Sequence, residues 1–403
     1  MGEEGIVCPV CRSVSVTYKS ESGEWAGLEC GGRFPGLLLG EPAGQHPPDD
    51  LESATSQNNL GNLLSDKGNY VAAEPLYRHA LAIREKDLGS EHPDTAESLN
   101  NLARLLYTIG DYAAAEPLFH RALVIREKVL GPEHPDTAMS LNNLALLLDT
   151  KGDYAATEPL YRRALAIREK VLGPEHPDTA ESLNNLAMLL KAKGDYAAAE
   201  PLFHRALAIR EKVLGPEHPD TATILNNLAL LLMATGDHAA AEPLYRRALA
   251  ILEKTLGVEH PNTAMSLNNL ATLLEAKGDY AAAEPLYHRA YAILEKTLGP
   301  EHPKTGVILS NLAALLRDSG DYAAAEPLFS RARITLEKVL GPWHPDTAVS
   351  LGNQAMLLKA RGDYAAAESL YRRALAIREK ALGPEHPDTA TILNNLATLL
   401  KAK

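Results

Sequence analysis

The sequence has few of the residues that stabilise small or secreted domains. Only three of its 403 residues are cysteines, and all three lie within the first 30 residues, so no disulfide framework holds the rest of the chain together. Aromatic residues make up 5% of the chain, and leucine and alanine dominate its 45% hydrophobic content. This mixture favours closely packed helices over strands.

The sequence also lacks a basic surface charge, a membrane span and a secretion signal. Its formal net charge of −12 disfavours nucleic acid as a partner, because binding to phosphates needs a basic face. No hydrophobic run approaches the roughly 20 residues that a transmembrane helix requires. The acidic residues 1–4 do not resemble a signal peptide. We therefore expect a cytoplasmic protein with no membrane partner.

What the sequence does contain is the tripeptide His-Pro-Asp, or a close variant, every 42 residues. No insertion or deletion interrupts this spacing. A fixed period of this length is typical of a solenoid, which presents a long repeated surface rather than one closed pocket. The histidines of the tripeptide are His92, His134, His176, His218, His260, His302, His344 and His386.

Each unit contains two helical patterns. After His134, Pro135 suits the first turn of a helix, and Asp153 can cap a second helix that follows a Lys-Gly stop signal. We therefore predict an all-α solenoid of antiparallel helix pairs from residue 51 to residue 403. The apolar residues of the first pattern have the spacing of one helix face: Leu141, Leu144, Ala145 and Leu148.

The motifs Asn-Asn-Leu-Ala, Gly-Asp-Tyr and Arg-Ala-Leu in these units resemble the tetratricopeptide repeat. The 42-residue length and the segment Arg-Ala-Leu-Ala-Ile-Arg-Glu-Lys-Val-Leu-Gly-Pro-Glu-His-Pro-Asp-Thr resemble the long variant found in kinesin light chains and many bacterial arrays. The resemblance covers residues 51–403. It implies a right-handed superhelical α-solenoid of about eight and a half repeats that binds proteins.

One asparagine recurs in the first helix of every unit. Its amide could hydrogen-bond a neighbouring helix and fix the register of the repeats, which is a structural interpretation. It could also face a concave groove and bind the backbone of an extended peptide, and the two roles can coexist. The predicted groove residues of this kind are Asn101, Asn143, Asn185, Asn227, Asn269 and Asn311.

The residues beside these asparagines change from unit to unit, whereas the buried stripe stays nearly constant. Met139 and Leu146 occupy this varied stripe in one unit, Met188 in the next and Leu230 in a third. Drift on a solvated face is the alternative, although drift would give more uniformly polar residues. We predict a groove that binds an extended peptide or partner protein, which makes the chain an interaction scaffold. A cargo adaptor of a motor or signalling assembly is the narrower alternative that the kinesin light chain resemblance implies.

No catalytic motif accompanies the repeats. The sequence has no GxxxxGK[ST] loop, no HExxH helix and no GxSxG elbow, and almost no residue after position 50 breaks the period. We therefore predict that the chain is not an enzyme. The periodic histidines should be too far apart to share a metal ion, so a structural role in the turn before proline is favoured.

One unit departs from the others beside its histidine. Trp343 stands where the other units have glutamate, as at Glu301. An exposed tryptophan can anchor a partner, and packing onto the adjacent turn is the structural alternative.

Residues 1–50 form a separate segment. Cys8 and Cys11 form half of a zinc knuckle, with Cys30 as a candidate third ligand, but Arg33 stands where a zinc ribbon would carry its next cysteine. His46 is a candidate substitute. Zinc is thus the one candidate cofactor, and a degenerate or disordered leader is the alternative. A zinc-dependent regulatory or nucleic-acid module with the repeats as its partner arm is a further functional alternative.

The sequence ends at the close of a first-helix pattern. Leu393, Leu396 and Leu400 keep the apolar spacing, whereas the outer face of a terminal repeat is normally polar. This pattern predicts either a truncated fragment or end-to-end self-association.

Overall fold

The chain forms two compact units, Met1–Ala54 and Thr55–Lys403. The predicted zinc ligands, Cys8, Cys11 and Cys30, lie outside the described residues, so this site remains a prediction. The computed structural model describes residues 16–19, 24–27, 33–34 and 51–402.

The described part of the first unit is a small antiparallel sheet. Its strands are β1 (Val16–Lys19), β2 (Glu24–Gly27) and β3 (Arg33–Phe34), in the order β1-β2-β3. Thr17 pairs with Ala26 across β1 and β2, and Arg33 pairs with the same Ala26 across β2 and β3. β2 is therefore the central strand.

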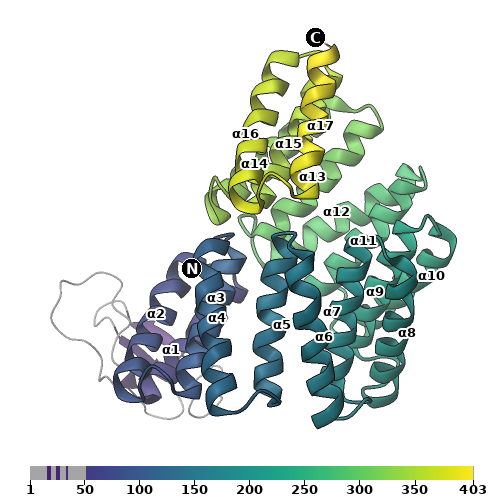
Figure 1. Ribbon diagram of the computed structural model, residues 1–403. Helices are drawn as coiled ribbons and strands as arrows, with labels where there is room; N and C mark the ends of the chain where they lie inside the picture. The colour runs from purple at the N-terminus through teal and green to yellow at the C-terminus, as the bar shows by residue number, and fades with distance from the viewer. Residues whose placement is uncertain (1–15, 20–23, 28–32, 35–50, 403) are drawn as a thin grey trace. The chain divides into compact units, whose positions relative to one another are not determined.

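Seventeen α-helices follow in the described part of the chain and confirm the predicted all-α solenoid (Figure 1). They form eight consecutive pairs with α17 as a further first helix, and consecutive helices pack against each other. The first helices are α1 (Leu51–Asp66), α3 (Pro93–Thr108), α5 (Pro135–Thr150), α7 (Pro177–Ala192), α9 (Pro219–Ala234), α11 (Pro261–Ala276), α13 (Pro303–Asp318), α15 (Pro345–Ala360) and α17 (Pro387–Ala402). The second helices are α2 (Tyr70–Asp87), α4 (Tyr112–Val129), α6 (Tyr154–Val171), α8 (Tyr196–Val213), α10 (His238–Thr255), α12 (Tyr280–Thr297), α14 (Tyr322–Leu340) and α16 (Tyr364–Leu382).

The periodic histidines cap the first helices. In α5, the Nδ1 atom of His134 accepts a hydrogen bond of 3.1 Å from the backbone N–H of Asp136, and Pro135 occupies the first helical position, where its missing N–H does no harm. The other seven histidines make the same bond. The prediction that they order the turn between repeats is confirmed.

A glycine and an aspartate set the turn inside each helix pair. Gly152 follows α5 with a φ of +77°, a conformation that glycine adopts without the steric cost of a side chain. The Asp153 carboxylate then accepts a hydrogen bond of 3.0 Å from the N–H of Ala156 and caps α6, as predicted. Each repeat thus specifies its own helix ends locally.

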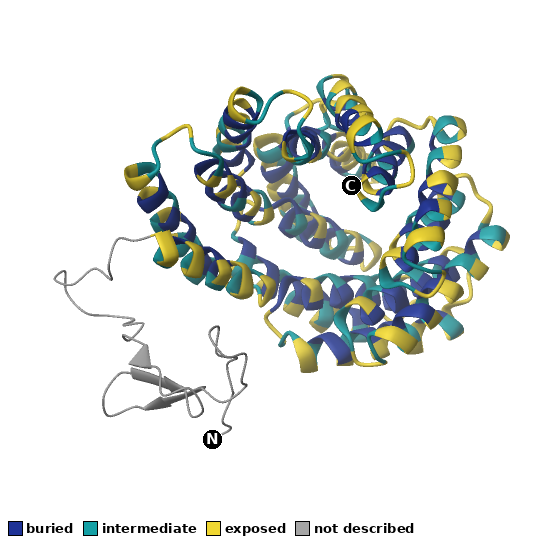
Figure 2. Ribbon diagram, turned by 90° about the horizontal axis from the view of Figure 1, so that it is seen from below, coloured by how far each residue is buried: buried dark blue, intermediate teal, exposed yellow. Residues whose placement is uncertain are grey.

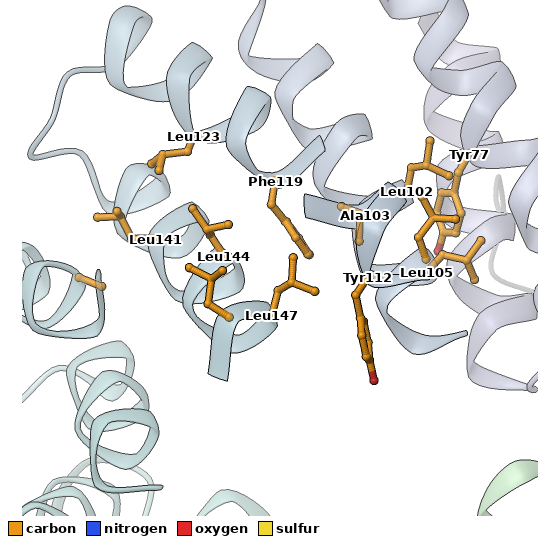
Figure 3. Close-up of a cluster of buried hydrophobic side chains, with 14 of the residues drawn as sticks. Tyr77, Leu102, Ala103, Leu105, Tyr112, Phe119, Leu123, Leu141, Leu144 and Leu147 are labelled. Atoms are coloured by element: carbon orange, nitrogen blue, oxygen red, sulfur yellow. The ribbon is translucent and has the colours of Figure 1, made fainter. Parts of the chain in front are cut away.

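The hydrophobic core lies between neighbouring helices and contains both small and large side chains. Ala103 and Phe119 are buried among leucines of α3 and α5, including Leu102, Leu144 and Leu147 (Figure 3). The alanines allow neighbouring helices to approach closely, and each buried leucine contributes about 1.5–3 kcal/mol. Buried residues lie where neighbouring helices contact each other, and exposed residues lie on the helix faces turned away from those contacts (Figure 2).

A ladder of ion pairs connects neighbouring loops and second helices. Lys128 Nζ lies 2.6 Å from the Glu91 carboxylate, and the pair recurs with the same 37-residue separation. In the last such position Trp343 replaces the glutamate, and the ammonium of Lys380 lies 4.2 Å from the centre of the Trp343 ring. The other pairs are Lys170–Glu133, Lys212–Glu175, Lys254–Glu217, Lys296–Glu259 and Lys338–Glu301.

The repeats curve far enough for late repeats to contact early ones. The Nε2 atom of His344 lies 3.2 Å from the carbonyl oxygen of Thr108, 236 residues earlier. A Cβ atom on Gly110 would lie 2.6 Å from the His344 ring. The contact recurs twice, at Gly68 with His302 and at Gly152 with His386. We call these three contacts the seam.

Candidate functional site

The first helices lie on the inner side of the curved repeat stack. First helices of consecutive repeats contact each other directly, as α3 with α5, α5 with α7 and α13 with α15. The predicted groove residues all belong to these helices. We call the face formed by the recurring asparagines and their varied neighbours the groove stripe.

The structure shows a hydrogen-bonding role for several asparagines. The Asn143 amide donates to the Asn100 side-chain oxygen of the preceding repeat at 2.7 Å. The same bond links Asn227 to Asn184 at 2.8 Å and Asn311 to Asn268 at 2.8 Å. These bonds join first helices of neighbouring repeats and satisfy amides that are half-buried. The structural interpretation of these three asparagines is thus confirmed, whereas their binding role stays a prediction.

The other predicted asparagines keep more of their hydrogen-bonding capacity. The side-chain oxygens of Asn185 and Asn269 accept from the adjacent Asn184 and Asn268, and no bond from their own amide groups is found among the described residues. Asn101 lines a small cavity with Tyr77. All three side chains are half-buried, which suits groups that bind a ligand backbone.

The varied apolar residues are exposed to different degrees. Leu146 is 43% exposed, whereas Leu144 on the same helix is 1% exposed. Met139, Met188 and Leu230 are half-buried. The stripe therefore offers apolar contact area that helix packing leaves open, and methionine adapts readily to different partners.

Two half-buried charges lie at equivalent positions of neighbouring repeats. Burial raises the pKa of Asp149 to about 6 and lowers the pKa of Lys191. Neither side chain forms an ion pair with another described residue. Both belong to the groove stripe, so an acidic and a basic group are available to a ligand in adjacent repeats.

A larger hollow opens at the later end of the groove stripe. It has a volume of about 460 Å³ and is lined by Thr272, Glu275, Tyr287 and Asn311, among others. Tyr287 donates to Glu275 at 2.8 Å, and burial raises the pKa of that glutamate. The hollow combines the carboxylate of Glu275, the phenol of Tyr287 and one of the recurring asparagines, Asn311. Thr272 and Glu275 were not predicted from the sequence, although their positions on the varied stripe could have indicated them.

No cluster of three or more potential metal ligands occurs among the described residues. No helix in the described part of the chain is long and apolar enough to cross a membrane. The arrangement that remains is a long inner face of amides, apolar patches and isolated charges.

The comparisons with known proteins concern the helical repeats. The tetratricopeptide repeat family matches in eight overlapping segments that together run from residue 52 to residue 403. No curated protein matches the chain.

Several solved structures are similar to this chain. A variant of a Podosopora anserina putative kinesin light chain with nearly identical TPR-like repeats is 31% identical, with 51% of this chain and 97% of that chain covered and a TM-score of 0.43. BtubC (BKLC) from P. vanneervenii is 25% identical, with coverages of 59% and 93% and a TM-score of 0.45. The apo form of RapI is 17% identical, with coverages of 71% and 99% and a TM-score of 0.52.

The family matches cover all the helical repeats, and the helix pairs, caps and small-residue contacts of the structure account for the matched motifs. The chain belongs to the tetratricopeptide repeat family.

Proposed function

We propose that this chain is an interaction scaffold that binds an extended segment of a partner protein along the groove stripe. The observation that carries the proposal is the contrast within one helix. Leu144 is buried in the core, whereas the side chain of Leu146, two residues later, is 43% exposed. A face that is apolar without being used for packing suits a binding surface.

The asparagines support the same mode of binding. An amide both donates and accepts, so it can pair with the backbone of an extended peptide in any sequence. Asp149 and Lys191 would then select among peptides, because an unpaired half-buried charge favours a ligand group of opposite sign. Position-dependent selectivity follows from the varied chemistry of the stripe.

A cargo adaptor is the narrower form of this proposal. It is supported by the sequence similarity to a putative kinesin light chain, which covers half of this chain. It requires that the scaffold bind two partners at once, namely a cargo and a carrier. Co-purification of a coiled-coil partner with the chain would support it.

A peptide-array screen followed by titration of the best peptide tests the scaffold. The double variant Leu146→Ala and Met188→Ala should weaken binding by about tenfold or more, while stability changes little because both side chains are partly exposed. Val124→Ala is a matched control, because Val124 is an exposed apolar residue on the second helix α4. Equal binding by the double variant and by the control would refute the groove.

The asparagine variants Asn185→Ala and Asn227→Ala complete the test. Asn227 also bonds Asn184, so its variant must be compared with Asn353→Ala, which loses the equivalent bond to Ser310 and is not a predicted groove residue. We expect weaker peptide binding with unchanged helicity in circular dichroism. Undiminished binding would count against a role of the amides in recognition.

A further inference from the structure

The seam joins two surfaces that every repeat carries. One is the turn inside a helix pair, such as residues 108–111. The other is the loop between pairs that carries the histidine, such as residues 341–346. Below, these are called the turn and the loop.

Two hydrogen bonds define the tautomer of the loop histidine in the seam. The Nδ1 atom of His344 accepts from the backbone N–H of Asp346 at 3.0 Å, so its Nε2–H donates to the carbonyl of Thr108 at 3.2 Å. His302 and His386 face the backbone carbonyls of Asp66 and Thr150 in the same way. The seam is thus a row of neutral histidines that cap their own helix and bind an earlier turn.

Five further turns have no such neighbour. A Cβ atom built on Gly68, Gly110 or Gly152 meets a seam histidine, whereas nothing lies within 4 Å of the same atom on the glycines of the later turns. These open turns all keep the positive φ that shapes the turns of the seam. Their glycines are Gly194, Gly236, Gly278, Gly320 and Gly362.

Five loops are open as well. The side chains of His134, His176 and His218 are about 40% exposed, whereas His344 is 7% exposed in the seam. The open histidines keep the same capping bond, and therefore the same orientation of Nε2. His92 and His260 belong to the same set.

We propose that a second copy of this chain docks on these surfaces, with the open turns of one copy against the open loops of the next. The seam is the precedent, because it pairs the same two surfaces within one chain. The basic groups of the turns and the acidic groups of the loops add charge complementarity. In the seam, Lys67 and Glu301 line one cavity of about 510 Å³. Among the open turns, Lys193 and Lys277 occupy the position of Lys67. Each also pairs with a glutamate of its own chain, Glu158 or Glu242, and both lysines remain partly exposed at the turn.

This contact is head-to-tail. Each copy offers its turns at one edge and its loops at the other, so the two partners use different surfaces. Binding of one neighbour leaves the other edge free. Association therefore continues into linear assemblies instead of stopping at a symmetric dimer.

Sedimentation velocity of the full chain near pH 7.5 tests the proposal. The mean mass should rise through dimer to larger species between about 1 and 100 μM. The triple variant His134→Asn, His176→Asn and His218→Asn keeps a capping side chain but loses the imidazole donor. Its association constant should fall by at least about tenfold, because three hydrogen bonds at the contact are removed.

A matched control uses three histidines on second helices, His120→Asn, His204→Asn and His288→Asn. These side chains are exposed and belong to neither the turns nor the loops, so assembly should not change. A second variant, Lys193→Glu with Lys277→Glu, should weaken assembly from the opposite edge. A wild-type chain that stays monomeric at about 100 μM, a dimer that does not grow, or a loop variant that assembles like the wild type would each overturn the proposal.

Discussion

His218 and His344 both begin a His-Pro-Asp-Thr segment and make the same capping bond, yet their surroundings differ. His218 is 40% exposed at an open loop. His344 is 7% exposed, and burial against the turn at Thr108 lowers its pKa. The comparison shows that the repeat specifies the conformation of the loop, whereas the curvature of the whole stack decides which loops are buried. The predictions below test this difference.

The largest effect is expected from adding a methyl group to a turn of the seam. Gly110→Ala and Gly278→Ala both place alanine at a φ near +80°, which costs about 1–2 kcal/mol in each case. Only at Gly110 does the new Cβ lie 2.6 Å from the His344 ring, which adds about 1–3 kcal/mol or opens the seam. Chemical denaturation should show the larger loss for Gly110→Ala, and small-angle scattering should show expansion for this variant alone. Equal behaviour of the two variants would mean that the seam does not form in solution.

A second, smaller effect is expected from acid. Burial is the main cause that lowers the pKa of His302 to about 4, and it also lowers the pKa values of His344 and His386. Unfolded histidine has a pKa near 6.5, so the unfolded chain takes up these protons first. The stability that the neutral histidines provide is therefore present above about pH 6.5 and is lost as the pH falls from 6.5 towards 4.

The groups around these histidines modify that pH dependence. Lys304 lowers the pKa of His302 further, whereas Asp346 opposes the shift at His344. Asp149 acts in the opposite direction, because its pKa is raised to about 6 and its protonation relieves a buried charge. Thermal unfolding from pH 7.5 to 4.5 should show the loss for the wild type. The triple variant His302→Asn, His344→Asn and His386→Asn should be less sensitive to pH, and an identical pH profile would contradict this origin.

The smallest effect is expected where the ion-pair ladder changes at the seam. Trp343→Glu replaces the contact between Lys380 and the indole ring with the ion pair found in the other repeats. Both contacts are exposed, since Trp343 is 52% exposed, so the change in stability should stay within about 0.5 kcal/mol. Glu217→Trp, at the equivalent position of an open loop, is the matched control. A clearly larger loss for Trp343→Glu would show that the indole stabilises the seam, whose cavity it lines beside Gly110 and Tyr112.

Much of the local structure could be predicted from the residues alone. Pro135 and Asp153 indicated where helices begin, and the structure places them at those ends. These signals act over three or four residues, so they work without knowledge of the fold. The role of each recurring asparagine is harder to predict. An asparagine that bonds a neighbouring repeat and one whose amide is left for a ligand stand in the same sequence motif. The bond from Asn143 to Asn100 depends on how the two repeats pack, which the sequence of one repeat does not specify.

The seam and the charged groups of the groove could not be predicted. The contact between Thr108 and His344 joins residues 236 positions apart, and the eight closely similar histidine segments do not indicate which three lie in the seam. The raised pKa of Asp149 likewise depends on how far neighbouring helices exclude water from it.

The repeat, the helix pairs and their caps follow from the amino-acid sequence alone, because each depends on signals within one 42-residue unit. The tertiary structure decided which equivalent residues differ: which histidines lie in the seam, which asparagines bond each other and which leucines remain open. The physical reason is that the rotations between successive repeats add up along the chain. A small rotation at each repeat is nearly invisible locally, yet summed over several repeats it brings distant units into contact.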